Sequence, residues 1–187
     1  KNTNSIVNNE SADIIRMFNS EFDQLGATKG DYYPIKYREK IEEMNTFIYK
    51  NINNGVYRSG FATTQEAYDE AIETLFNGLD KLEDILSKNR FLLGDQITES
   101  DWRFLPTLLR FDSVYHGHFK CNKRKIREYD SLFNYTKELY QYPGVSKTYD
   151  DTYSKLHYYG SHATVNPTGI IAHGPSFEFD QNHNRNI

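Results

Sequence analysis

The chain has 187 residues, which is enough for one sizeable hydrophobic core, and its net charge is −4 with lysines and arginines scattered along it. No basic stripe points to a nucleic acid or to an anionic membrane surface, and no apolar run is long enough to span a bilayer. The single cysteine, Cys121, excludes an internal disulfide and favours a reducing compartment, so we expect a cytoplasmic protein.

The N-terminal stretch "IVNNESADIIRMF" places an acid and a hydroxyl together where a helix begins. Glu10 and Ser11 precede an apolar run with helical spacing, which Gly26 is expected to end. A helix start offers unpaired N–H groups and a partial positive charge, so Ser11 can help to hold a carboxylate while Glu10 faces an ammonium group. Both residue types are also ordinary helix caps, and the sequence leaves both interpretations open. The preceding Ser5–Val7 is β-like, and we expect a strand there.

Two helices are predicted between residues 34 and 86. Pro34 opens the first of them, and Gly55 lies beyond its end. The glycine-punctuated loop that follows leads into the second helix, where Thr63 and Glu66 have the spacing of a capping box. Apolar residues then recur at steps of three and four, which is the strongest helical pattern in the chain: Tyr68, Ile72, Leu75, Leu79, Leu82 and Leu86.

A second capping box is predicted in "FLLGDQITESDWRFLPTLLRF". Thr98 is the expected cap, and Asp101 returns a hydrogen bond to the N–H of the cap residue. Ile97 and Trp102 have the spacing of a hydrophobic staple around this box. We therefore assign Thr98 and Asp101 to folding rather than to ligand binding, and we place Trp102 in the core.

The rest of the chain continues the helical pattern and then changes character. Asp130 is expected to cap a helix that ends at Pro143, and a further helical stretch runs to about Leu156. Beyond it, glycine, proline, asparagine and histidine become frequent, which predicts an extended tail. The pattern as a whole predicts an all-α bundle.

Two groups of residues invite a chemical interpretation that the pattern does not favour. His116 and His118 form an H-x-H pair without cysteine or acidic ligands at suitable spacing, so we expect no metal and assign them to packing at a helix end. Cys121 has basic neighbours that favour a thiolate, yet a structural thiol is the preferred interpretation.

The order of these parts resembles the glutathione transferases, whose subunit joins a thioredoxin-like domain to an all-helical one. In that family a Glu-Ser pair before a helix grips the γ-glutamyl end of glutathione, and a Ser/Thr-x-x-Asp box lies deep in the helical domain. The match narrows to the glutathionyl-hydroquinone reductases, also called the Xi class. Five stretches resemble that family in the same order: "NNESADIIRMFN", "GVYRSGFATTQEAY", "ESDWRFLPTLLRFD", "HGHFKCN" and "NPTGII".

This resemblance implies three parts. Residues 1–26 resemble the last strand and helix of a thioredoxin-like, glutathione-binding domain, residues 34–156 the helical C-terminal domain of a transferase, and residues 157–187 a C-terminal tail. Because the chain starts with Lys1 and the lone strand has no partner in the sequence, we expect most of the thioredoxin-like domain to lie upstream.

The resemblance also implies an activity. Family members use glutathione as co-substrate to reduce glutathionyl-hydroquinones to hydroquinones, without a metal, and they form homodimers. By the same resemblance, Glu10 takes the ammonium and Ser11 the carboxylate of glutathione, while Tyr57 and Tyr158 surround the quinol ring. For Tyr159 we prefer a packing role.

One departure from the family pattern is large. The family's nucleophile is a cysteine followed by proline and tryptophan, and no such motif occurs here. We therefore expect the nucleophile upstream and this chain alone to be inactive. Two alternatives stay open from the sequence: a non-catalytic docking or dimerising module, and a protein that binds quinols without turnover.

Overall fold

The computed structural model describes residues 4–175 and 178–185, and its regular structure is helical, with no strand in these ranges. The α-helices are α1 (Ser11–Ser20), α2 (Arg38–Ile48), α3 (Gly55–Gly60), α4 (Gln65–Leu86), α5 (Glu99–Arg110), α6 (His116–His118), α7 (Asp130–Tyr140) and α8 (Asp151–Ser161). Short 3₁₀ helices cover Asp23–Leu25, Ile35–Tyr37, Ile126–Glu128 and Val145–Thr148. Two π-helical turns, Tyr49–Asn53 and Phe111–Tyr115, extend α2 and α5. No helix in the described part of the chain is long and apolar enough to cross a bilayer.

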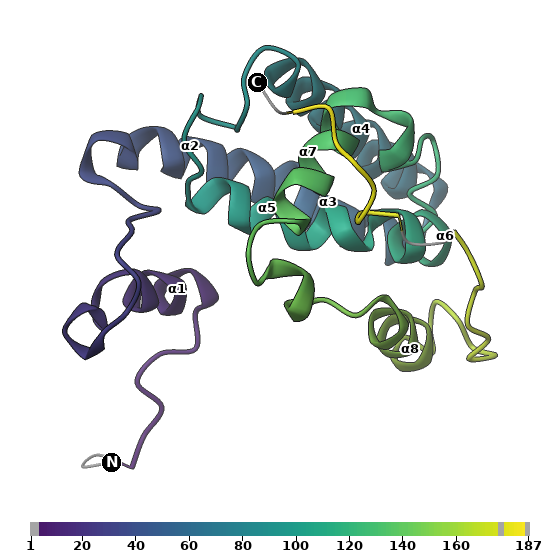
Figure 1. Cartoon of the computed structure of the whole chain (residues 1–187). Helices are drawn as coiled ribbons and strands as arrows, with labels where there is room; N and C mark the ends of the chain where they lie inside the picture. The colour runs from purple at the N-terminus through teal and green to yellow at the C-terminus, as the bar shows by residue number, and fades with distance from the viewer. Residues whose placement is uncertain (1–3, 176–177, 186–187) are drawn as a thin grey trace.

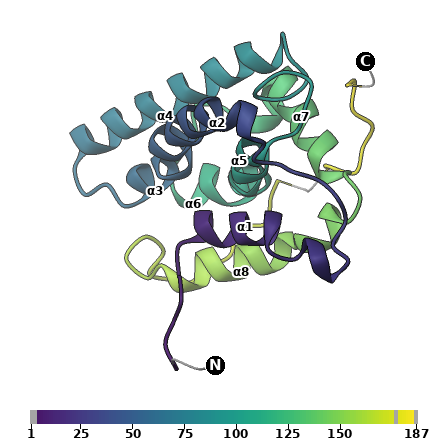
Figure 2. The same cartoon turned by 90° about the vertical axis from the view of Figure 1, so that its left-hand side faces the viewer.

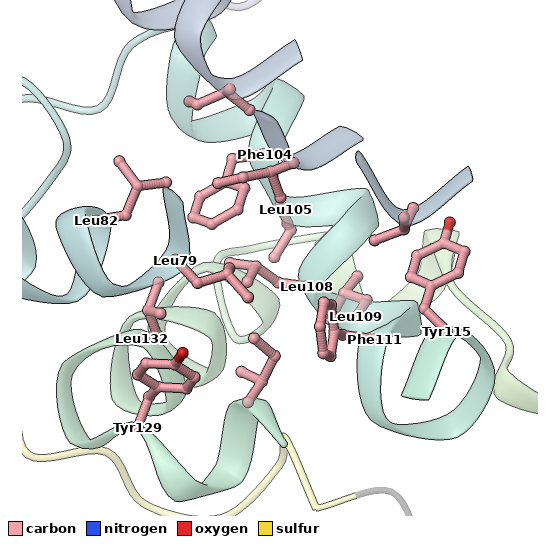
Figure 3. Packing of buried hydrophobic residues seen from close by; sticks show 14 of the residues in the cluster. Leu79, Leu82, Phe104, Leu105, Leu108, Leu109, Phe111, Tyr115, Tyr129 and Leu132 are labelled. Atoms are coloured by element: carbon pink, nitrogen blue, oxygen red, sulfur yellow. The ribbon is translucent and has the colours of Figure 1, made fainter. Parts of the chain in front are cut away.

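The core lies where α4, α5 and α7 meet (Figure 3). The predicted stripe of α4 faces inward, and Leu79 and Leu82 are fully buried against α5 and α7. Phe104 and Leu108 of α5 fill the space between them, and both are also fully buried. Each such side chain contributes about 1.5–3 kcal/mol through burial. The all-α bundle predicted from the periodicity is therefore confirmed.

The capping box at the start of α5 is confirmed. The Asp101 carboxylate accepts the Thr98 N–H at 2.8 Å and the Thr98 hydroxyl at 3.0 Å. The other carboxylate oxygen accepts the Leu92 N–H at 3.0 Å and the Tyr135 hydroxyl at 2.8 Å. Asp101 is fully buried, so it joins the α5 start to the preceding loop and to α7 in addition to capping the helix.

The capping box predicted at the start of α4 is wrong. Thr64, not Thr63, is the cap, and its hydroxyl oxygen accepts the Ala67 N–H at 3.2 Å. Glu66 therefore lies in the first turn of the helix and returns no bond to the cap. Spacing alone could not choose between two adjacent threonines.

The cap predicted for α7 is also wrong. Asp130 is the first helical residue and Tyr129 precedes it as the cap position. The N–H groups of Ser131 and Leu132 in the first turn instead donate to the carboxylate of Glu83, at 2.8 and 2.7 Å. Glu83 belongs to α4, so packing of α7 on α4 supplies the negative group that the helix start requires.

The N-terminal segment carries α1, which lies beside the bundle rather than within its core (Figures 1 and 2). The predicted strand at Ser5–Val7 is wrong, because these residues are extended or bent and belong to no ladder. A strand needs a partner to satisfy its backbone groups, and the described residues offer none. Helix α1 ends at Ser20, before the predicted stop, and Gly26 instead ends the 3₁₀ turn Asp23–Leu25 in the left-handed conformation, with φ of 83°.

The C-terminal residues do more than extend along the surface. Helix α8 continues past Leu156 to Ser161 and so includes both tyrosines of "HYY". Further along, Phe179 is buried, and Arg185 donates to Glu138 of α7 at 2.9 Å and to the carbonyls that follow α4. The described end of the tail therefore joins α4 to α7.

Candidate functional site

A cavity of about 810 Å³ lies between the N-terminal segment and the bundle. Helix α1 and the loop after it form one wall, and the π-helical turn after α2, helix α3 and helix α5 form the other. The lining residues are mostly aromatic or polar, among them Ser11, Phe18, Tyr32, Tyr33, Tyr49, Asn53, Tyr57, Trp102 and Arg103. A cavity of this size and composition suits a small organic ligand with polar groups.

The predicted glutathione residues lie at the mouth of α1. Ser11 is the first helical residue, is exposed and lines the cavity. Glu10 is the cap position, but its side chain makes no capping hydrogen bond, and its backbone N–H donates to Asn8 at 2.7 Å. Glu10 is exposed beside the cavity rather than part of its lining. The capping interpretation of this acid is therefore not supported, and its carboxylate faces solvent.

A buried ion pair fixes α1 against the bundle. Arg16 donates through Nε and Nη2 to the two carboxylate oxygens of Glu99, each at 2.9 Å. Glu99 is only 4% exposed and also accepts from Asn45 at 2.9 Å and from Arg103 at 3.3 Å. Hydrogen bonding to Glu99 raises the pKa of Arg16, so the guanidinium stays charged. This pair links the helix that carries Ser11 to the helix that carries Arg103.

The two tyrosines predicted for the quinol ring come together, although 101 positions separate them. Their hydroxyl oxygens are 2.6 Å apart, and the Tyr158 hydroxyl lies 2.9 Å from that of Tyr115. Tyr57 is half-buried and lines the cavity, whereas Tyr158 is 8% exposed and lines a second hollow. Sequence reasoning missed Tyr115, which lies in a π-helical turn that gives no periodic signal.

The phenol of Tyr57 is a neutral donor at physiological pH. Burial, followed by the hydrogen bond with Tyr158, raises its pKa to about 12. A protonated phenol can donate to an oxygen on a ligand and cannot act as a base there. The arrangement therefore suits the binding of a hydroxylated ring.

Trp102 differs from its predicted core position. It packs on the hydrophobic cluster but remains partly exposed on the wall of the cavity. Its ring meets Tyr32 and Tyr142 edge to face, with centroids 5.7 and 5.3 Å away. Trp102, the residue predicted to form the hydrophobic staple with Ile97, thus also lines the cavity.

Cys121 and His118 pack as the sequence favoured. Cys121 is fully buried, and burial raises the pKa of its thiol to about 12, so it is not a ready nucleophile. His118 is hydrogen-bonded to His162 at 3.1 Å and packs on Tyr159, with ring centroids 4.6 Å apart. Within residues 4–175 and 178–185, no three potential metal ligands lie together.

Comparison with known proteins agrees with this architecture. The family described as "Glutathione S-transferase, C-terminal domain" matches residues 65–138. Glutathionyl-hydroquinone reductase YqjG of Escherichia coli is 51% identical over the whole chain, and PcpF of Sphingobium chlorophenolicum is 53% identical over 91% of it. The chain spans only 57% and 55% of these two relatives.

Solved structures give the same result. The glutathione-bound structure of Escherichia coli YqjG superposes over all of this chain and 61% of that one, with a TM-score of 0.97 at 51% identity. The Xi-class transferase of Natrialba magadii matches 97% of this chain and 55% of its own, with a TM-score of 0.94 at 48% identity. The helical bundle of this chain therefore has the fold of a glutathione S-transferase C-terminal domain.

Proposed function

We propose that this chain forms the larger part of an enzyme that uses glutathione to reduce glutathionyl-hydroquinones to hydroquinones. The observation that carries the proposal is the 2.6 Å contact between the Tyr57 and Tyr158 hydroxyls, with Tyr57 on the wall of the cavity that Ser11 also lines. Two curated relatives named as glutathionyl-hydroquinone reductases support it, at 51% and 53% identity.

Glutathione is the proposed ligand at the mouth of α1. Its γ-glutamyl carboxylate would accept the Ser11 hydroxyl and the free N–H groups of the first turn, where the helix dipole favours an anion. Its ammonium would face the uncapped carboxylate of Glu10. The Arg16–Glu99 pair supports this assignment, because it holds α1 in place beside the cavity.

The hydroquinone ring is the proposed ligand of Tyr57 and Tyr158. Their phenols can donate to quinol oxygens while the neighbouring aromatic rings form a flat slot. In the reaction, a thiolate attacks the glutathionyl sulfur, the sulfur–ring bond breaks, and the ring carbon gains a proton. A second glutathione then resolves the mixed disulfide, so one glutathionyl-hydroquinone and one glutathione give one hydroquinone and one glutathione disulfide.

The attacking thiol is proposed to come from a Cys-Pro-Trp motif outside these 187 residues. Cys121, the single cysteine of the sequence, is buried beneath the bundle surface, and nothing places its sulfur at the cavity. Without a positioned nucleophile, binding alone should give no useful rate. We therefore expect this chain alone to release no glutathione disulfide from glutathionyl-hydroquinone and glutathione.

Disulfide release tests this assignment directly. Joining this sequence to a thioredoxin-like domain with the Cys-Pro-Trp motif should give turnover that is lost when the cysteine of the motif is changed to alanine. Robust turnover by the 187-residue chain that Cys121→Ala abolishes would contradict the assignment.

Removing the two hydroxyls tests the quinol site. In the joined protein, Tyr57→Phe and Tyr158→Phe should each lower turnover while circular dichroism stays unchanged. Tyr37→Phe is the matched control, because Tyr37 lines neither the cavity nor the second hollow and its loss of a hydroxyl should leave turnover unchanged. Equal turnover in all three variants would remove the tyrosines from the site.

A homodimer is also proposed. Sedimentation at micromolar concentration should show a species of twice the 22.0 kDa chain mass. The second candidate function is a non-catalytic docking or dimerising module, which the burial of the single cysteine favours. A dimer that binds neither glutathione nor hydroquinone would support that alternative.

A further inference from the structure

A second hollow, of about 490 Å³, lies beside Tyr158. Tyr158 lines it together with Arg110, Tyr149, Asp150 and His157. Tyr57, which lines the large cavity, has its hydroxyl 2.6 Å from that of Tyr158, so this contact joins the lining of one space to the lining of the other.

Helix α5 runs past both spaces. Pro106 lines the large cavity, and Arg110, one helical turn later, lines the hollow. The Arg110 guanidinium donates to the Pro106 carbonyl at 2.8 Å and lies over the Tyr149 ring, 5.4 Å from its centroid. A carbonyl and an aromatic face thus hold this charged group beside the hollow.

Among residues 4–175 and 178–185, no carboxylate forms an ion pair with Arg110. The ion pairs found there involve other side chains. Asp150, the acid of the hollow, is the cap of α8 and accepts the Tyr153 N–H at 3.0 Å. Asp151 accepts from the Tyr149 hydroxyl and pairs with Lys155 at 3.0 Å. The half-buried guanidinium therefore retains free donors toward the hollow.

We infer that the hollow beside Tyr158 receives a carboxylate substituent of the hydroquinone ring, and that Arg110 sets a preference for such acidic hydroquinones. The inference rests on the proposed quinol site, because it needs the ring to lie against Tyr57 and Tyr158. A ring held there directs one edge toward the hollow, where a guanidinium can bind a planar carboxylate through two N–H groups.

Binding of two ring compounds that differ in one carboxylate tests the preference. The probes are 2,5-dihydroxybenzoate and benzene-1,4-diol, titrated calorimetrically into the 187-residue chain at pH 7. We expect the acid to bind roughly tenfold more tightly, as one charge-assisted contact allows. Arg110→Gln should bring the acid within about twofold of the diol, and Arg110→Lys should retain part of the difference.

Arg124→Gln is the matched control, because it removes the same charge from an exposed pair with Asp80 on α4. It should leave the ratio of the two affinities unchanged. A second measurement needs no substitution. Raising the salt concentration should weaken the binding of the acid and leave the binding of the diol unaffected. The ratio therefore remains a test even if Arg110→Gln does not fold.

The outcomes separate the two proposals. Diol binding that Tyr57→Phe weakens, with no preference for the acid, would overturn the role of Arg110 and leave the quinol site standing. A preference that survives Arg110→Gln would also overturn it. If neither probe binds, the proposed quinol site and the inference that rests on it both fall.

Discussion

Arg16 of α1 and Glu99 of α5 form a bidentate ion pair, although 83 positions separate them in the chain. Glu99 is almost fully buried, whereas the Arg16 side chain is 28% exposed and also pairs with Glu42. Arg16 in turn lies over the Tyr33 ring, 4.0 Å from its centroid. Glu99 is thus the buried one of the two carboxylates that hold α1 beside the cavity.

Glu99→Gln should destabilise the protein by about 2 kcal/mol, because it leaves the Arg16 guanidinium without its buried partner. Urea unfolding followed by circular dichroism measures the loss. Lys88→Met is the control, since it breaks an exposed pair with Asp84 and should change the free energy of unfolding by less than about 0.5 kcal/mol. Equal effects of the two variants would contradict the role of the buried pair.

Asp101→Ala should cost about 3 kcal/mol, more than the roughly 1 kcal/mol expected of a capping box alone. The carboxylate satisfies donors from three segments, and alanine leaves the buried Leu92 N–H, Thr98 N–H and Tyr135 hydroxyl unpaired. Glu66→Ala, at the box that does not form, should have little effect. A melting temperature unchanged by Asp101→Ala would show that this network does not stabilise the fold.

Stability should decrease as the pH falls from about 6.5 to about 4. Burial, with smaller effects of His162 and Lys120, lowers the pKa of His118 to about 4, so the unfolded chain takes up a proton first as the solution is acidified. Below the folded pKa, both states are protonated and this contribution no longer changes. His118→Gln should flatten the pH dependence of the unfolding midpoint in this window, whereas His173→Gln, at an exposed position, should not.

Cys121 should resist alkylation by iodoacetamide at pH 8 while the protein is folded. The thiol is fully buried and its pKa is raised to about 12 by burial, so the reactive thiolate is scarce and shielded. Mass spectrometry should show modification only after unfolding in urea. Rapid labelling of the folded chain would indicate that the cysteine is accessible.

Gly60→Ala should destabilise the protein by about 2 kcal/mol, because the added methyl group would overlap the Phe119 ring. Gly160→Ala is the matched control, since no atom lies within 4 Å of the position of its Cβ in α8. That change should be neutral or slightly stabilising through helix propensity. Similar melting temperatures for the two variants would argue against the close approach of α3 to Phe119.

The sequence by itself determined the features that depend on neighbouring residues. The stripe of α4 and the Thr98–Asp101 box both follow from spacings of a few positions, because helix periodicity and capping are local. The strand predicted at Ser5–Val7 is absent from the structure. A strand depends on hydrogen bonds to another segment, and local spacing does not show whether such a segment is present.

Only the tertiary structure decided which residues from distant segments come into contact. Glu83 caps α7 from another helix, Arg16 reaches Glu99, and Tyr57 meets Tyr158 with Tyr115 behind it. The resemblance proposed Tyr57 and Tyr158 as separate residues, but the distance between their hydroxyls depends on how α8 packs against the bundle. Arg110 gave no signal in the sequence, because a cation becomes informative only where packing half-buries it beside a hollow.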